Sequence, residues 1–311
     1  MKHQRQEANI KQANKLNQVK WTIINNVIIT EKTKFMFGQS EFKSNVRFFI
    51  ASLNLFILTS FISCTAQPNK IADWKTNCTV TKKIRNITFS FPSTGFAFDF
   101  RDSIIDACFE AIKHDLSIIH QNEYTDTITA MFLSSREEMR GFTGSPAAGN
   151  AFPQMRKVWF VANKGLSPPI KHELMHMITI SSWGQPPQQS NWLKEGIAAY
   201  AENSCNGFTV EQIYAFFEKK NMLIPIDSLT AHFYMEPEMI AYHQSAYISE
   251  YLIENYGVQK FSLLWQSGID SFEKIYGFQF KQILLDIRNK LDKKYPEAPS
   301  ISWDNFKTGC N

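Results

Sequence analysis

The chain has 311 residues, 44% of them hydrophobic, which is enough to bury a large core in one or two domains. The formal net charge is +4, but the nine Lys or Arg and three Glu before residue 48 contribute +6, which leaves about −2 for the remainder. A nucleic-acid-binding domain would carry clustered basic charge on its folded part, so composition argues against that class.

The first pattern along the chain is an apolar run over residues 48–63, preceded by Lys43 and Arg47. This arrangement is typical of an export signal, and the run is shorter than the roughly 20 residues of a membrane-spanning helix. It ends in a stretch that resembles a bacterial lipoprotein box, with Cys64 as the lipidated residue, although Phe61 stands where Leu is usual. The alternative is an amino-terminal anchor helix that is retained.

The polar lead of residues 1–35 is long for an export signal, so we hypothesise that Met36 is the true start and that the lead is an erroneous extension. We therefore expect residues 1–63 to be lead and signal, 64–76 a tether and 77–311 the folded domain. This organisation predicts an exported bacterial cell-envelope lipoprotein, on the periplasmic face or the cell surface. Peptide mapping of the precursor that found residues before Met36 would refute the hypothesis on the start.

Four cysteines remain after Cys64: Cys78, Cys108, Cys205 and Cys310. An exported protein can oxidise them, and four cysteines allow two disulfides with three possible pairings. Four buried thiols are the alternative.

Strand and helix patterns alternate at first and then become helical. Alternation or helical spacing predicts a strand at 79–91, a packing helix at 101–121, a strand at 126–133, a short helix at 134–139, a loop at 141–152 and a strand at 157–162. Helices are predicted over 210–220, 237–256, 258–266 and 278–291.

A short motif, His172-Glu173-Leu174-Met175-His176, lies on a predicted helix with Ser167 as its N-cap. Residues four apart project from one helix face, so the imidazoles of His172 and His176 can reach one zinc ion. Glu173 borders that ion without ligating it and can act as the general base toward a water molecule that the zinc activates. A catalytic zinc keeps one position open, so a third protein ligand is needed, and Glu195 is the candidate.

The spacing from this motif to W-L-K-E-G-I-A-A-Y, which contains Glu195, resembles the gluzincin metallopeptidases, and the second segment resembles their peptidase-MA-like branch. The resemblance implies an α+β fold, with a small mixed sheet and packing helices in 77–183, a mainly helical part in 184–311, and the zinc cleft between them. It also implies Zn²⁺ as the cofactor. The strand at 157–162 would be either the sheet edge beside the cleft, where an extended peptide can add, or a buried core strand.

Further site residues follow from the resemblance. Tyr242 best matches the position of the oxyanion donor, with His243 and Tyr247 as alternatives, and each could instead be core packing. Glu202 lies on the same helix face as Glu195. It either orients a ligating histidine through a hydrogen bond or is a solvated surface acid. Thermolysin-like enzymes carry an acid where this chain has Ala199, so the partners of the ligands must differ.

We therefore expect a zinc peptidase that acts on a peptide or protein, is monomeric, contacts the membrane through its lipid anchor and does not bind nucleic acid. Aminopeptidase relatives carry a G-x-M-E-N motif before the zinc helix, and residues 144–150 contain no acid, which favours an endopeptidase or an enzyme of narrow specificity. The alternative is a lipoprotein that binds peptide or protein and cuts nothing.

Overall fold

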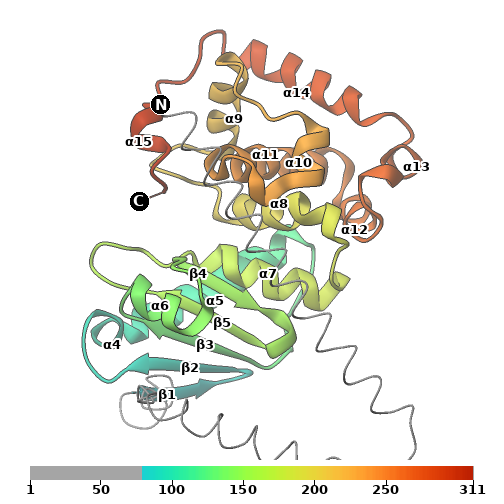
Figure 1. Cartoon of the computed structure of the whole chain (residues 1–311). Coiled ribbons are helices and arrows are strands. Elements are labelled where there is room, and N and C mark those ends of the chain that lie inside the picture. Colours follow the sequence, from blue (N-terminus) through green and yellow to red (C-terminus); the bar gives the residue numbers. More distant parts are fainter. Residues whose placement is uncertain (1–78, 311) are drawn as a thin grey trace, which may run out of the picture. The chain divides into compact units, whose positions relative to one another are not determined.

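The computed structural model describes residues 79–310, which belong to one compact unit (Figure 1). The expected export signal, Cys64 and Cys78 lie outside this range. Between residues 79 and 310, no helix has the length and the hydropathy needed to cross a bilayer.

The first part of the described chain forms a five-stranded mixed sheet with the order β1-β2-β3-β5-β4. β2, β3 and β5 run parallel, whereas β1 and β4 lie antiparallel to their neighbours at the two edges. The strands are β1 (Thr79–Ile84), β2 (Ile87–Pro92), β3 (Ile128–Leu133), β4 (Gly149–Phe152) and β5 (Lys157–Val161).

The single strand predicted at 79–91 is wrong: this stretch is a hairpin of β1 and β2 in which Ile84 pairs with Ile87. Arg85 occupies the turn with φ of 54°, a left-handed conformation that non-glycine residues seldom adopt. The Asn86 side chain donates hydrogen bonds to the Tyr124 and Asp126 carbonyls at 2.9 and 2.7 Å. These bonds tie the turn to the chain that enters β3.

The loop predicted at 141–152 is wrong at its end, because β4 forms there and pairs with β5 through Asn150 and Trp159. β5 therefore lies inside the sheet between β3 and β4. Of the two readings of the strand at 157–162, the interior one is confirmed. The edge on this side of the sheet is β4, whose four residues are too few to give a clear alternating pattern.

One face of the sheet packs into the main core. Phe91, Phe132 and Phe160 stack across β2, β3 and β5, with ring centroids 4.8 and 5.1 Å apart. α5 (Arg101–Ile118) and α7 (Ile170–Trp183) contribute to the same cluster of buried side chains, while α6 (Arg136–Thr143) packs Met139 on the other face. α7, which carries the H-E-x-x-H motif, is therefore held in place by packing against this face of the sheet.

The rest of the described chain is helical, which confirms the α+β fold (Figure 1). Among the described residues, the sequence patterns did not predict the short helices α4 (Phe96–Asp99), α10 (Ile226–His232), α13 (Phe272–Tyr276) and α15 (Trp303–Phe306). The helices are α4 (Phe96–Asp99), α8 (Asn191–Glu202), α9 (Val210–Lys219), α10 (Ile226–His232), α11 (Glu238–Tyr256), α12 (Val258–Ser267), α13 (Phe272–Tyr276), α14 (Phe280–Lys294) and α15 (Trp303–Phe306), with 3₁₀ turns at Pro153–Met155, Gln188–Ser190, Phe233–Met235 and Ile269–Ser271.

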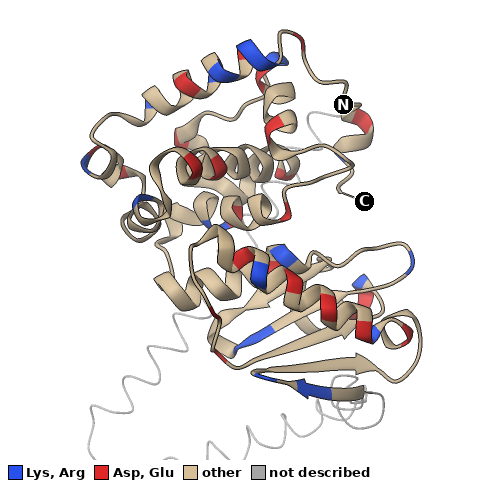
Figure 2. Ribbon diagram, turned by 180° about the vertical axis from the view of Figure 1, so that it is seen from behind, with Lys and Arg blue, Asp and Glu red and all other residues tan. Residues whose placement is uncertain are grey.

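α8 and α11 cross at very close range at Gly196. A Cβ at this position would lie 2.6 Å from Ser249 Oγ and 2.7 Å from the Ser245 carbonyl oxygen. Only glycine allows this approach, which fixes α8 against the helical part. Acidic and basic residues are interspersed along the ribbons of α5 and α14 (Figure 2).

Candidate metal centre

α7 carries the H-E-x-x-H motif and begins later than expected. Pro169, and not Ser167, is its N-cap residue, and no side chain caps the helix. A residue before proline avoids the helical conformation, so Pro169 keeps Pro168 extended and the helix cannot start before it. Ile170, Leu174, Met175 and Ile178 are buried and fix the rotation of α7, so that its histidines face the helical part.

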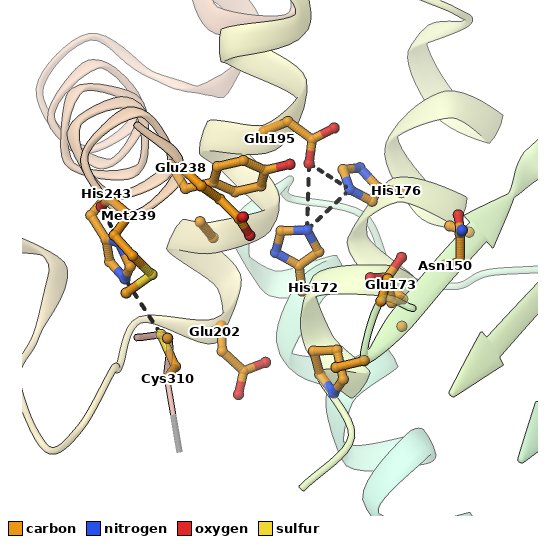
Figure 3. A pocket seen from close by; sticks show the side chains of 18 of the residues that line it. Asn150, His172, Glu173, His176, Glu195, Glu202, Glu238, Met239, His243 and Cys310 are labelled. Carbon is orange, nitrogen blue, oxygen red and sulfur yellow. Dashed lines mark hydrogen bonds and ion pairs between the residues drawn. The ribbon is translucent and has the colours of Figure 1, made fainter. Parts of the chain in front are cut away.

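α7 and α8 pack against each other and bring three donor atoms together (Figure 3). The two Nε2 atoms of His172 and His176 lie 3.2 Å apart. Glu195 Oε2 lies 3.5 Å from His172 Nε2 and 3.2 Å from His176 Nε2. The two predicted histidines and the predicted glutamate therefore converge on one point.

These separations fit a zinc ion. In a tetrahedral site with zinc–ligand distances of about 2.0 to 2.1 Å, neighbouring ligand atoms lie about 3.3 Å apart. The three distances of 3.2, 3.5 and 3.2 Å bracket that value. Two imidazole nitrogens and one carboxylate oxygen are also the donor set of catalytic zinc sites of the His₂Glu type.

Glu195 is held by two residues that sequence reasoning missed. The Tyr234 hydroxyl donates a hydrogen bond to Glu195 Oε1 at 2.7 Å, and Lys194 Nζ lies 3.1 Å from the same oxygen. Both contacts leave Oε2 free to face the histidines. Tyr234 lies in the 3₁₀ turn Phe233–Met235, distant in sequence from both motifs, so no local pattern could have identified it.

The charges of the cluster stabilise one another. Burial opposes ionisation of Glu195, but His176, His172 and Lys194 outweigh it and hold the pKa of this carboxyl well below its usual range. Burial likewise disfavours the charged form of His172, but Glu195 and Glu173 outweigh that effect and raise the pKa of His172. The pocket therefore attracts positive charge, whether as protons or as a metal cation.

Glu173 lies on the other side of the histidines, toward Asn150 and β4 (Figure 3). It is 7% exposed, and burial raises its pKa against the lowering effect of His172 and His176. The Ala151 backbone N–H donates a hydrogen bond to the carboxylate. Gly149 leaves room for it, since a Cβ there would lie 2.5 Å from Glu173 Cγ.

An open cleft of about 1280 Å³ contains this cluster. The three candidates for the oxyanion donor, Tyr242, His243 and Tyr247, differ in their position relative to this cleft. Tyr242 lines the cleft, with its ring centroid 6.2 Å from that of His172. Burial raises the pKa of Tyr242, which keeps its hydroxyl a hydrogen-bond donor. His243 lies farther along the wall beside Cys310, whereas Tyr247 is fully buried with its hydroxyl 3.4 Å from Glu211. Tyr242 is therefore the best placed.

Glu202 also lines the cleft, but no described residue hydrogen-bonds its Oε2 atom. The Nδ1 atom of His176 is buried and likewise has no partner among residues 79–310. The hydrogen bond considered between Glu202 and a ligating histidine is therefore not formed in this structure.

Comparisons with known proteins bear on the same segment. Residues 151–291 match the family model described as the peptidase MA superfamily. No curated protein matches the chain. Among solved structures, the crystal structure of an aminopeptidase N family protein from Idiomarina loihiensis is similar at 11% identity and a TM-score of 0.34, covering 74% of this chain and 46% of that one. The chain thus spans less than half the length of that neighbour.

The matched segment contains both α7 and α8, and therefore all three converging side chains together with Glu173. Residues 151–291 are thus similar to a domain of the peptidase MA superfamily, which supports a gluzincin-like peptidase.

Proposed function

We propose that the protein is a zinc-dependent peptidase that hydrolyses peptide bonds. The convergence of His172 Nε2, His176 Nε2 and Glu195 Oε2 at the edge lengths of a zinc tetrahedron carries this proposal. These three residues would hold the ion. When bound, zinc supplies Lewis acidity, which polarises the scissile carbonyl and lowers the pKa of water.

Glu173 serves as the general base. It accepts a proton from the attacking water and passes that proton to the leaving amine. Its burial supports this role, because a carboxylate whose pKa is raised binds a proton more readily near neutral pH. The Ala151 N–H and the space left by Gly149 hold the carboxylate in position.

The substrate lies extended along β4. This strand is one of the two edges of the described sheet, and its residues 149–151 line the cleft. A peptide can add to such an edge through backbone hydrogen bonds, which bind main chain irrespective of side chain. The scissile bond would then be placed between Glu173 and the histidines.

Tyr242 stabilises the oxyanion of the tetrahedral intermediate. Its ring stacks near His172, and its hydroxyl stays protonated because burial raises its pKa. β4 lines the cleft and carries no acid that could capture a free amino terminus. The absence of an acid from this strand favours an endopeptidase, or an enzyme of narrow specificity, over an aminopeptidase.

Glu173→Gln tests the proposal, with Glu273→Gln on α13, an exposed position, as the matched control. The Glu173 variant should retain one zinc per chain while hydrolysis of casein or a peptide library falls by orders of magnitude, and the control should keep both. A wild-type protein that binds zinc and cleaves nothing would refute the peptidase and leave a peptide-binding protein. A wild-type protein without zinc would refute the metal centre itself.

The same proposal places the enzyme at the bacterial cell envelope, as an exported lipoprotein anchored through Cys64. The support is the apolar run 48–63 with its basic flank and the residues around Cys64. Metabolic labelling with a fatty-acid analogue should mark the wild type and not Cys64→Ala. Equal labelling of the two proteins would refute the lipid anchor and would leave the proposal of peptidase activity unaffected.

A further inference from the structure

The carboxyl-terminal segment forms part of the cleft wall, opposite the sheet. Residues 307–310 line the cleft, and the Asn206 side chain donates a hydrogen bond to the Gly309 carbonyl at 3.0 Å. A disulfide joins Cys310 to Cys205, which is 105 residues away in sequence. Of the pairings that the sequence left open, this one is formed, while Cys108 is a buried free thiol.

His243 lies beside this disulfide with a defined tautomer. Its Nδ1 atom is 2.8 Å from the Met239 carbonyl oxygen, which can only accept, so Nδ1 carries the proton. The lone pair of Nε2 then points toward Cys310 Sγ at 3.8 Å (Figure 3). A backbone carbonyl on one ring nitrogen and a free lone pair on the other is the arrangement of a metal-ligating histidine.

The spacing of the three side chains suits a tetrahedral ion. In such a site with zinc–sulfur distances of about 2.3 Å, two sulfurs lie about 3.8 Å apart and a sulfur and an imidazole nitrogen about 3.6 Å apart. One ligand atom from each of Cys205, His243 and Cys310 already lies within 4.8 Å of the other two. The two cysteine Cα atoms are 4.9 Å apart, so side-chain rotation suffices to separate the sulfurs after reduction.

We propose that Cys205 and Cys310, once reduced, bind a thiophilic divalent cation of the zinc type together with His243. This second site shares no ligand with the cluster of His172, His176 and Glu195. Two thiolates and one imidazole select such a cation over Mg²⁺ or Ca²⁺, and three protein ligands leave a fourth position for water. The disulfide and the metal site are thus alternative states of the same three residues.

A dithiol reductant supplies the two electrons. Its thiolate attacks the exposed Cys310 sulfur, forms a mixed disulfide and releases the Cys205 thiolate, and its second thiol then displaces Cys310 and completes the reductant's own disulfide. Both cysteine thiols lose their protons to solvent when the cation binds. His243 has no proton to lose at Nε2, and burial lowers its pKa to about 4, so it stays neutral near pH 7.

Co²⁺ binding to the full chain tests this proposal, because thiolate ligation gives a sulfur-to-cobalt charge-transfer absorption that histidine and carboxylate ligation does not. Oxidised wild type should bind Co²⁺ without this absorption, and protein reduced with a dithiol that is then removed should bind one further equivalent with it. His172→Ala, which disrupts the first site, should keep the absorption. The charge-transfer absorption therefore tests the second site independently of the proposed peptidase activity.

His243→Ala is the decisive variant, since it keeps every cysteine of the chain. It should weaken the thiolate-bound Co²⁺ by more than about 100-fold, because loss of even an outer-shell partner costs 10- to 100-fold. The control is His232→Ala, an exposed histidine outside both sites, which should bind as wild type does. Reduced wild type that gains no cobalt, or a reduced His243 variant that binds as tightly as the control, would overturn the proposal. Circular dichroism of each reduced variant verifies that it is folded.

Discussion

Gly149 faces the candidate general base, and replacing it with alanine should uncouple catalysis from metal binding. The new Cβ would lie 2.5 Å from Glu173 Cγ, 2.7 Å from its Oε1 and 2.8 Å from Pro169 Cγ. Ordinary contact begins near 3.4 Å, so the Glu173 side chain must move by about 0.9 Å. The three converging donors do not touch Gly149 and should keep their positions.

The size of the effect follows from the reach of a proton transfer. A base works within about 2.6 to 3.2 Å of the proton it abstracts, and a misplacement of about 1 Å costs about 100-fold in rate. We therefore expect Gly149→Ala to lower kcat/KM by about 100-fold, or about 2.7 kcal/mol of transition-state stabilisation. Zinc content should stay at one ion per chain.

Peptide hydrolysis and metal analysis on the same preparation measure both quantities. Gly141→Ala is the matched control, because a Cβ there meets nothing within 4 Å and should leave activity unchanged. A Gly149 variant with wild-type kcat/KM would show that Glu173 is not positioned by β4. A variant that loses its zinc would show that the strand supports the ligands as well.

Three further predictions concern the packing, the titration and the chemistry of the described residues. Gly196→Ala should lower the free energy of unfolding by about 1 to 3 kcal/mol in urea denaturation, since its Cβ would meet the backbone of α11, and a loss below about 0.5 kcal/mol would contradict this packing. Burial raises the pKa of Asp115 to about 7, so the folded state holds its proton more tightly than the unfolded state does. Stability should therefore fall by up to about 1.4 kcal/mol per unit as the pH rises from about 4 to 7, and Asp115→Asn should flatten that slope, whereas parallel profiles would refute the assignment. Tyr242→Phe should reduce kcat by about 100-fold or more with zinc retained and KM little changed, and an unaltered kcat in steady-state assays would exclude Tyr242 as the oxyanion donor.

The ligand helix was predictable because its signal is local. Two histidines four residues apart share a face of any α-helix, and the buried Leu174 and Met175 determine which way that face turns. The place of Glu195 is not local, since it depends on how α7 and α8 pack. The sequence indicated it only through its likeness to a family motif, and the convergence of the three donor atoms agrees with that assignment.

Other parts of the site left no readable pattern. β4 is four residues long and follows a stretch rich in glycine and alanine, so its pairing with β5 outweighs a weak intrinsic preference. In the β1–β2 turn, Arg85 adopts the left-handed conformation for which glycine is usual. The sequence therefore lacks the glycine-containing signal by which a hairpin is recognised. Tyr234 reaches Glu195 from a 3₁₀ turn 39 residues downstream, a contact that only tertiary structure creates.

The bond between Cys205 and Cys310 has a practical consequence for anyone who modifies this protein. Any polypeptide fused shortly after Cys310 starts from the rim of the cleft and not from a remote surface. An affinity tag or reporter attached there would obstruct the entry of large molecules into the cleft, so fusion partners belong elsewhere on the chain. If the proposed peptidase activity fell with such a tag and returned on its proteolytic removal, Cys310 would be shown to border the cleft.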